Sequence, residues 1–248
     1  MRIRAALAVT LIAALLMPGA AHAACRDIDH DGRGYTVCSF DPATSDLRLF
    51  RLDPEGQILG SFSRLNAVLA DQGKALSFAM NAGMYHPDRA PVGLYIENGQ
   101  QQARAVASAG PGNFGMLPNG ILCLMDDAAR VIETRAYLAD PPACRDATQS
   151  GPMLVIGGAL HPRFLPDSAS RHIRNGVGVD ATGQVHFAIS DQPVSFHEFA
   201  RFFRDVLKTP DALYLDGKIS RLYAPALGRA DLGLPMGPMV GAVVDTPR

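Results

Sequence analysis

The sequence has 248 residues and a formal net charge of −1, with 48% hydrophobic and 19% charged residues. This balance excludes a disordered chain, and the lack of a basic excess argues against nucleic acid as a partner. The length allows one or two domains.

Residues 1–23 have the three parts of a secretory signal peptide. Arg2 and Arg4 form a positive start, residues 5–17 are apolar, and Ala21-His22-Ala23 is an A-x-A cleavage site. The apolar stretch is short for a membrane span, and an uncleaved anchor is the alternative. We expect a mature chain of residues 24–248, periplasmic or secreted, with no transmembrane segment after residue 23.

All four cysteines lie in the expected mature chain. An even number in an exported chain predicts two disulfides, and four cysteines allow three pairings. We favour Cys25–Cys38 and Cys123–Cys144, because each pair flanks a short loop-rich stretch; one bridge with two buried thiols is the alternative. No pair has the C-x-x-C spacing of zinc or thioredoxin-like sites.

The first half of the expected mature chain consists mainly of short strands between turns. A short helix is expected to begin at Ser63, with Leu65, Val68 and Leu69 on its apolar face and Gly73 at its end. Hairpins are expected through Asn98-Gly99 and Asp126-Asp127. Strands are expected at residues 35–40, 47–52, 76–80, 93–97, 103–107, 121–125 and 130–134.

The second half contains the clearest helix, at residues 195–208. Its apolar residues recur at helical spacing from Phe199 to Leu207, and Ser195 with Glu198 forms a capping box. The stretch after Pro141-Pro142 is expected to be loop, and strands are expected at 153–156, 176–179, 185–189, 212–215 and 239–244. This pattern predicts a single α+β domain, mainly antiparallel sheet with a few helices packed on it.

Polar residues stand where several expected strands end. Asn81, Ser190-Asp191 and Asp216-Gly217 follow apolar strands directly. A rigid sheet often holds catalytic groups at such positions, although Asn and Asp also initiate ordinary turns.

A basic cluster lies directly before an expected glycine-rich strand. Arg171 and Arg174 are three residues apart and could hold a phosphate in bidentate fashion, with a solvated surface pair as the alternative. The Gly/Pro turns at Ser150-Gly151-Pro152 and at residues 110–113 could offer backbone amides to an anion. No metal-ligand spacing, nucleotide-binding loop or nucleophile elbow is present, so we expect no metal and no cofactor.

Five segments in one order resemble the phosphodiester glycosidase family, the family of the mannose-6-phosphate uncovering enzyme, and especially its exported bacterial members. The resemblance runs from about residue 35 to residue 244, nearly the whole expected mature chain. Its segments are Asn81-Ala82-Gly83-Met84-Tyr85, Ser150-Gly151-Pro152-Met153-Leu154, Arg171 to Val179, Ser195 to Ala200, and Leu213-Tyr214-Leu215-Asp216-Gly217.

The resemblance implies hydrolysis of a sugar-1-phosphodiester, between the anomeric carbon and the phosphate oxygen, in an envelope glycan or polysaccharide. Asp216 and Asp191 are then the candidates that stabilise an oxocarbenium-like centre or activate water. Glu198 is a third catalytic candidate, although its capping box explains it structurally. The implied substrate-binding residues are Asn81, Tyr85, Ser150, Gly151, Arg171, Arg174, Asn175 and Gly217.

Two positions depart from the pattern of the uncovering-enzyme branch: Ala82 replaces a second glycine after Asn81, and Lys218 follows Gly217. The identity of the sugar therefore stays open. Two alternatives to the glycosidase also remain. One is a non-catalytic envelope protein that binds an anionic glycan, and the other is a metal-dependent phosphodiesterase with Asp191 and Asp216 as ligands.

Overall fold

The largest sheet has seven strands, and all its neighbouring strands are antiparallel. The computed structural model describes residues 24–216 and 218–246, so the expected signal peptide lies outside the described residues. Across this sheet the order is β1 (Ala24–His30), β2 (Arg33–Phe40), β13 (Val185–Ser190), β12 (Asn175–Val179), β14 (Asp211–Asp216), β10 (Met153–Ile156) and β11 (Ala159–Leu160).

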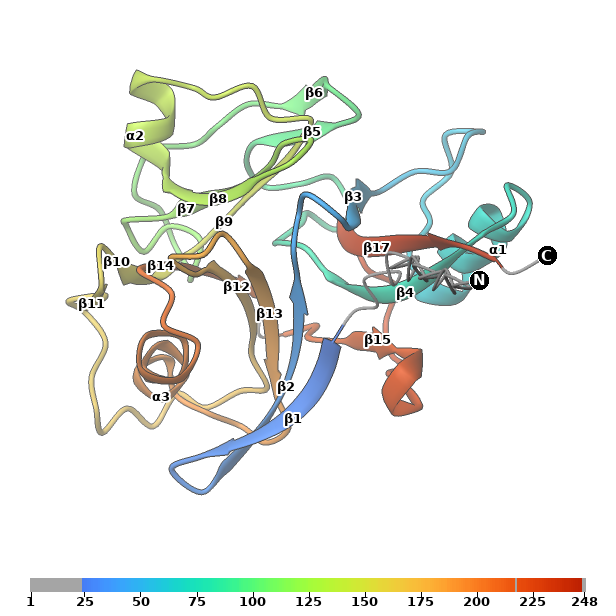
Figure 1. Cartoon of the computed structure of the whole chain (residues 1–248). Helices are drawn as coiled ribbons and strands as arrows, with labels where there is room; N and C mark the ends of the chain where they lie inside the picture. Colours follow the sequence, from blue (N-terminus) through green and yellow to red (C-terminus); the bar gives the residue numbers. More distant parts are fainter. Residues whose placement is uncertain (1–23, 217, 247–248) are drawn as a thin grey trace, which may run out of the picture.

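Two further antiparallel sheets have five strands each. One has the order β16 (Arg229–Ala230), β15 (Leu222–Ala224), β4 (Lys74–Asn81), β17 (Met239–Asp245) and β3 (Asp46–Phe50). The other has the order β6 (Gln100–Ala103), β5 (Tyr95–Glu97), β9 (Asp146–Ser150), β7 (Gly120–Leu124) and β8 (Ala129–Glu133). Figure 1 shows the three sheets around a common centre.

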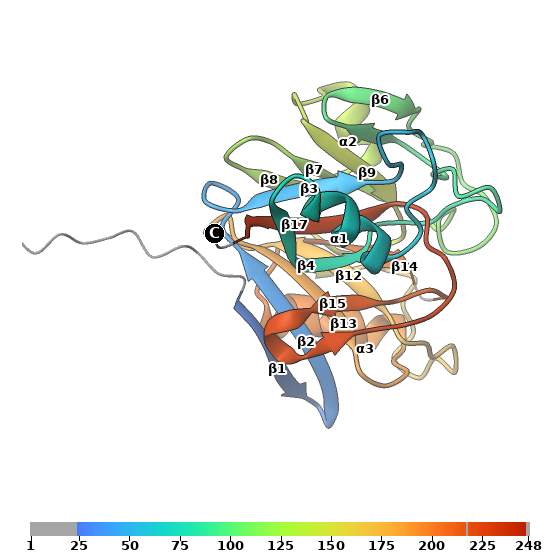
Figure 2. The same cartoon turned by 90° about the vertical axis from the view of Figure 1, so that its right-hand side faces the viewer.

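Short helices cover the outer faces of the sheets. Helix α1 (Phe62–Ala70) packs on the sheet of β4 and β17 through Leu65 and Leu69 (Figure 2). Helix α2 (Thr134–Ala139) follows β8, and α3 (Phe196–Arg201) runs into a π-helical turn, η1 (Phe202–Val206). A 3₁₀ turn, η2 (Pro225–Leu227), follows β15. None of these helices in the described part of the chain is long and apolar enough to cross a membrane.

One hydrophobic core joins all three sheets. Phe187 comes from the seven-stranded sheet, Phe78 from β4 and Leu122 from β7, and all three side chains are fully buried in one cluster. Because the sheets share this core, they form one domain. The prediction of a mainly antiparallel α+β domain is confirmed.

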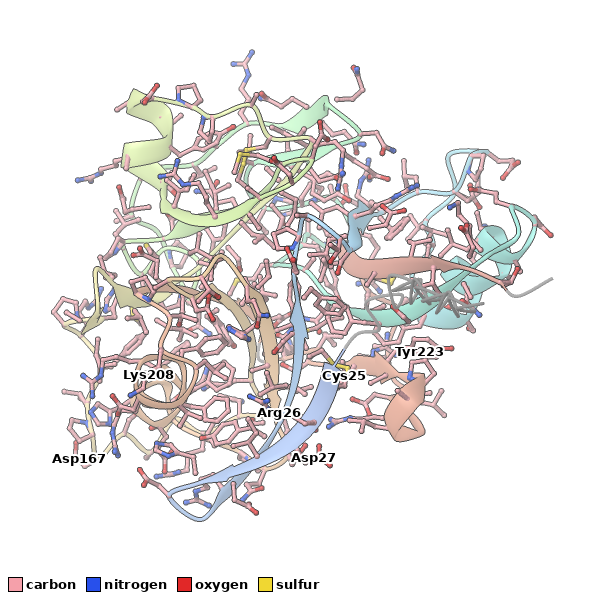
Figure 3. The ribbon with its side chains drawn as sticks, viewed as in Figure 1. Cys25, Arg26, Asp27, Asp167, Lys208 and Tyr223 are labelled. Carbon is pink, nitrogen blue, oxygen red and sulfur yellow. A yellow bond between two sulfur atoms is a disulfide. The ribbon has the colours of Figure 1, made fainter. Side chains whose placement is uncertain are left out.

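The disulfide prediction is also confirmed, with bridges Cys25–Cys38 and Cys123–Cys144. Cys25 and Cys38 face each other across β1 and β2, and Figure 3 labels Cys25 on β1. The second bridge ties β7 to the segment that leads into β9.

Several expected elements differ in detail. Helix α1 is capped by Ser61 rather than opened by Ser63, because the Ser61 hydroxyl accepts from the Arg64 amide. The clearest expected helix is α-helical only to Arg201. Its second half is a π-helix, and there Phe202 and Phe203 are both fully buried against the seven-stranded sheet. The capping box at Ser195 is present as predicted.

The sequence reasoning missed several elements that long-range pairing creates. The expected loop after Pro141-Pro142 contains β9, whose side chains are buried although most of them are polar. The strand after the Asn98-Gly99 turn occupies residues 100–103 instead of 103–107. Strand β1, helix α2 and the short strands β15 and β16 were not expected at all.

Candidate active site

Asp216 ends β14, an interior strand of the largest sheet. Its backbone N–H donates to Asn175 Oδ1 at 3.0 Å, and its carbonyl accepts from Ser220 Oγ at 2.5 Å. The preceding carbonyl, of Leu215, accepts from Ser150 Oγ at 2.9 Å. The buried side chains of Asn175 and Ser150, together with the half-buried Ser220, therefore fix the peptide that carries the Asp216 carboxyl group.

Asn81 and Asn175 form a buried amide pair beside Asp216. Asn81 Nδ2 donates to Asn175 Oδ1 at 3.2 Å, and Asn175 Nδ2 donates to the Asn81 carbonyl at 3.0 Å. Asn81 Oδ1 also accepts from the Arg221 amide at 2.9 Å. Both side chains are fully buried, so this pair joins the end of β4 to the start of β12. Asn81 and Asn175 were both expected to bind substrate, and in the structure they hydrogen-bond to one another.

The cavity beside Asp216 has a volume of about 800 Å³. Its walls come from the segment after β4, the Gly/Pro loop before β7, the segment before β12, the end of β14 with the residues after it, and the loop before β17. The lining residues are Met84, Tyr85, His86, Pro87, Arg89, Val92, Pro111, Gly112, Asn113, Phe114, His172, Tyr214, Asp216, Lys218, Ile219 and Leu234.

Asp216 is the one carboxylate among the described residues that line this cavity, whereas Arg89 and Lys218 are cationic. Lys218 N donates to Asp216 Oδ1 at 2.8 Å. The Arg89 guanidinium lies 5.2 Å from the centre of the Tyr85 ring, and its backbone φ is +66°. A positive φ is unfavourable for arginine. Arg89 adopts this backbone conformation at a position where it lines the cavity.

Two tyrosines line the cavity as neutral phenols. Burial, together with the nearby Asp216 charge, raises the pKa of Tyr85. Burial also raises the pKa of Tyr214, against the opposing charge of Arg174. Tyr85 is held in place, because its hydroxyl donates to Pro235 O at 3.1 Å and its ring packs on Gly237. A Cβ at position 237 would lie 2.6 Å from Tyr85 Cγ.

Ser150 and Gly151 lie outside the cavity lining. The Ser150 hydroxyl is fully buried and binds Leu215 O, as described above. Gly151 packs against Asn119, and a Cβ at Gly151 would lie 2.7 Å from Asn119 Cβ. Gly217, another expected substrate contact, lies outside the described residues.

Arg171 and Arg174 do not converge on one site. Arg171 is partly exposed and pairs with Glu198 at 2.6 Å. Arg174 is fully buried; its Nε donates to Val194 O at 2.9 Å and its Nη2 to Ser170 O at 3.1 Å. Its guanidinium carbon lies 3.7 Å from the Phe196 ring centre, and burial lowers its pKa.

Arg174 nevertheless lies close to the cavity. Its guanidinium carbon is 5.4 Å from the ring centre of Tyr214, which lines the cavity. Arg174 therefore places a buried positive charge behind that wall.

The carboxylates of Glu198 and Asp191 have partners away from the cavity lining. Glu198 accepts from the Ser195 amide at 2.7 Å and pairs with Arg171. Burial opposes its ionisation, but these hydrogen bonds outweigh burial and lower the pKa of Glu198 to about 2. Asp191 pairs with Arg229 at 2.9 Å. Within residues 24–216 and 218–246, no three His, Cys, Asp or Glu side chains gather as a metal site would require.

Several lining residues were absent from the expected site, notably His86, Arg89 and His172. In the sequence only their proximity to other candidate residues pointed to them. His86 and Arg89 follow Tyr85 in the same short segment, and His172 lies between Arg171 and Ile173 in the basic cluster. The Gly/Pro turn at residues 110–113, singled out for its backbone amides, does reach the cavity.

Comparison with known proteins agrees with this fold. The phosphodiester glycosidase family matches residues 74–231. The chain is 37% identical, over 191 residues, to the uncharacterized protein YigE of Escherichia coli strain K12, and the match covers 77% of this chain and 73% of that one.

Solved structures share the fold at 14% identity. The catalytic domain of zebrafish N-acetylglucosamine-1-phosphodiester alpha-N-acetylglucosaminidase, auto-inhibited by its pro-peptide, has a TM-score of 0.60, with 88% of this chain and 81% of that chain covered. A putative exported protein of Burkholderia pseudomallei, also at 14% identity, has a TM-score of 0.52, with 85% and 74% covered. From the match over residues 74–231, the chain belongs to the phosphodiester glycosidase family.

Proposed function

We propose that this protein hydrolyses a sugar-1-phosphodiester in the cavity described above, with Asp216 as the catalytic carboxylate. The observation that carries the proposal is the position of Asp216. It is the one carboxylate among the described lining residues, and its peptide is fixed by Asn175, Ser150 and Ser220. Family membership supports the same reaction class.

The charges around the cavity suit a phosphodiester, which carries one negative charge. Arg89 and Lys218 attract it at the cavity surface, and the buried Arg174 adds positive potential behind Tyr214. As the glycosidic bond breaks, negative charge grows on the leaving phosphate. These cations therefore bind the transition state more strongly than the ground state.

In the proposed step, the oxygen of a water molecule bonds to the anomeric carbon while the bond from that carbon to the phosphate oxygen breaks. The phosphate monoester leaves with the bonding electrons, and the proton of the water passes to Asp216. A phosphate departs readily without protonation, so a second carboxyl group to act as general acid is not needed.

We place this reaction outside the cytoplasm, on an envelope glycan or polysaccharide. Two disulfides suit an oxidising compartment, and residues 1–23 have the pattern of a signal peptide. A structural neighbour is itself described as a putative exported protein.

The test is release of free sugar from a panel of sugar-1-phosphodiesters by the purified mature protein, with and without EDTA. Asp216→Asn should abolish release. Asp167→Asn, the same change at an exposed aspartate on the loop after β11, should not alter it (Figure 3). Full activity of Asp216→Asn would remove this residue from the mechanism, and loss of wild-type activity with EDTA would indicate a metal-dependent phosphodiesterase instead. Tight binding of every substrate without release would indicate a glycan-binding protein.

A further inference from the structure

Much of the cavity wall is apolar. Met84, Val92, Phe114, Ile219 and Leu234 all line it. None of these side chains can satisfy a sugar hydroxyl, and a hydroxyl held against them without a partner loses its hydrogen bonds to water. The polar lining near Asp216 therefore suits the sugar and the phosphate, whereas this apolar wall suits a different part of the substrate.

The apolar wall continues onto an exposed loop whose backbone is fixed. Leu232 is 94% exposed and Leu234 is 67% exposed. Arg221 Nη2 donates to Leu234 O at 2.6 Å, and the Met236 amide donates to Gly60 O at 2.8 Å. The Tyr85 hydroxyl binds the intervening residue, as described above. Leu234 therefore extends the apolar wall of the cavity to an exposed surface, and contiguous exposed apolar surface often marks a ligand-binding groove.

Two segments each contribute one cationic and one apolar residue to the cavity lining. Lys218 is followed directly by Ile219, and Arg89 precedes Val92 by three residues; all four line the cavity. Each cationic side chain that could hold the substrate phosphate is therefore accompanied in the cavity lining by an apolar residue of its own segment.

We propose that the apolar wall and Leu234 bind a hydrocarbon chain esterified to the substrate phosphate. The substrate is then an amphipathic sugar-1-phosphodiester, with the sugar and phosphate at Asp216 and an aliphatic chain along the wall towards the exposed loop. This inference rests on the proposed function, since it assigns the group on the other side of the same phosphate.

The test measures binding of n-alkyl phosphates, from methyl to octyl phosphate, by calorimetry below the concentration at which they form micelles. Burial of each methylene should tighten the dissociation constant about threefold to fourfold until the chain passes the end of the wall. An affinity that does not depend on chain length would overturn the inference.

A matched pair of variants locates the chain. Leu234→Ser should weaken octyl phosphate binding several-fold and leave methyl phosphate binding unchanged. Leu165→Ser removes a leucine of similar exposure, 63%, that does not line the cavity, and should change neither. Equal losses in the two variants would show non-specific adsorption and refute the inference.

The binding assay does not require turnover. Length-dependent binding at Leu234 without hydrolysis of any phosphodiester would contradict the proposed reaction but retain the apolar subsite. Hydrolysis of a phosphodiester together with length-independent binding would support the proposed reaction and contradict the apolar subsite.

Discussion

Ser150→Ala should lower catalysis without changing substrate affinity. Strands β12 and β14 pair Asn175 with Asp216 and Gly176 with Tyr214, so Leu215 is the extra residue of a bulge. Ser150 Oγ donates to the Leu215 carbonyl at 2.9 Å, in a fully buried position. The serine therefore satisfies a carbonyl at the irregular point of the strand, directly before the proposed catalytic carboxylate.

The expected magnitudes follow from that geometry. Removal of the hydroxyl leaves a buried carbonyl without this partner, which costs about 1–3 kcal/mol of unfolding free energy. A bulge that relaxes moves the Asp216 carboxyl group, and a displacement of about 1 Å lowers kcat by up to about 100-fold. KM should stay nearly constant, because Ser150 does not line the cavity.

Ser77→Ala is the matched control. Ser77 Oγ also donates to a strand carbonyl, that of Ala242, at 3.2 Å, but on β4 and β17. Steady-state kinetics and urea unfolding of both variants separate the effects. Ser77→Ala should lose some stability and keep its kcat. Three results would refute the reasoning: an unchanged kcat in Ser150→Ala, an equal loss of kcat in the two variants, or an increase in KM alone.

If water attacks the anomeric carbon directly, with Asp216 as its base, proton NMR of the first product should show an inverted anomer, and a retained anomer would contradict the single-carboxylate mechanism. The folded-state pKa of Glu198 lies near 2, below its ordinary value of 4.5, so the stabilisation by this carboxylate is present above about pH 4.5 and is lost as the pH falls towards 2. The difference in urea midpoint between wild type and Glu198→Gln should therefore shrink as the pH falls from 4.5 to 2. A constant difference would disprove this role. Replacing Cys123 and Cys144 by alanine opens a bridge between residues 21 apart in sequence. The unfolding free energy in urea titrations should fall by about 3 kcal/mol, whereas an unchanged value would show that this bridge does not stabilise the fold.

Local signals in the sequence predicted local structure well. The Asn98-Gly99 hairpin and the Ser195 capping box depend on residues within a few positions of one another, and both are present. Strand β9 was missed because its polar residues look like loop. Thr148 and Gln149 are buried there only because distant segments provide their hydrogen-bond partners, such as the Ala82 carbonyl.

The candidate site shows the same division. Asp216 was chosen as a strand-end residue and Tyr85 from the family resemblance, and the structure places both at the cavity. His86 and Arg89 were passed over because nothing in their spacing distinguishes them from an ordinary polar loop. They line the same cavity as Asp216 only because β4, which precedes them, and β14, which ends at Asp216, come together from two different sheets. Such a long-range contact has no local signal in the sequence.

The two predicted arginines show why residue type alone does not reveal a partner. Arg171 and Arg174 have the spacing of a bidentate clamp, but Arg174 is fully buried on the Phe196 ring and Arg171 pairs with Glu198. Burying a guanidinium is costly unless nearby groups compensate for the lost water. The Val194 and Ser170 carbonyls and the Phe196 ring compensate for that lost water around Arg174. The guanidinium carbon lies 5.4 Å from the Tyr214 ring centre, so its charge acts on the cavity through that wall. A buried cation of this kind can attract an anion without touching it, and the spacing of residues in a sequence cannot distinguish that role from direct contact.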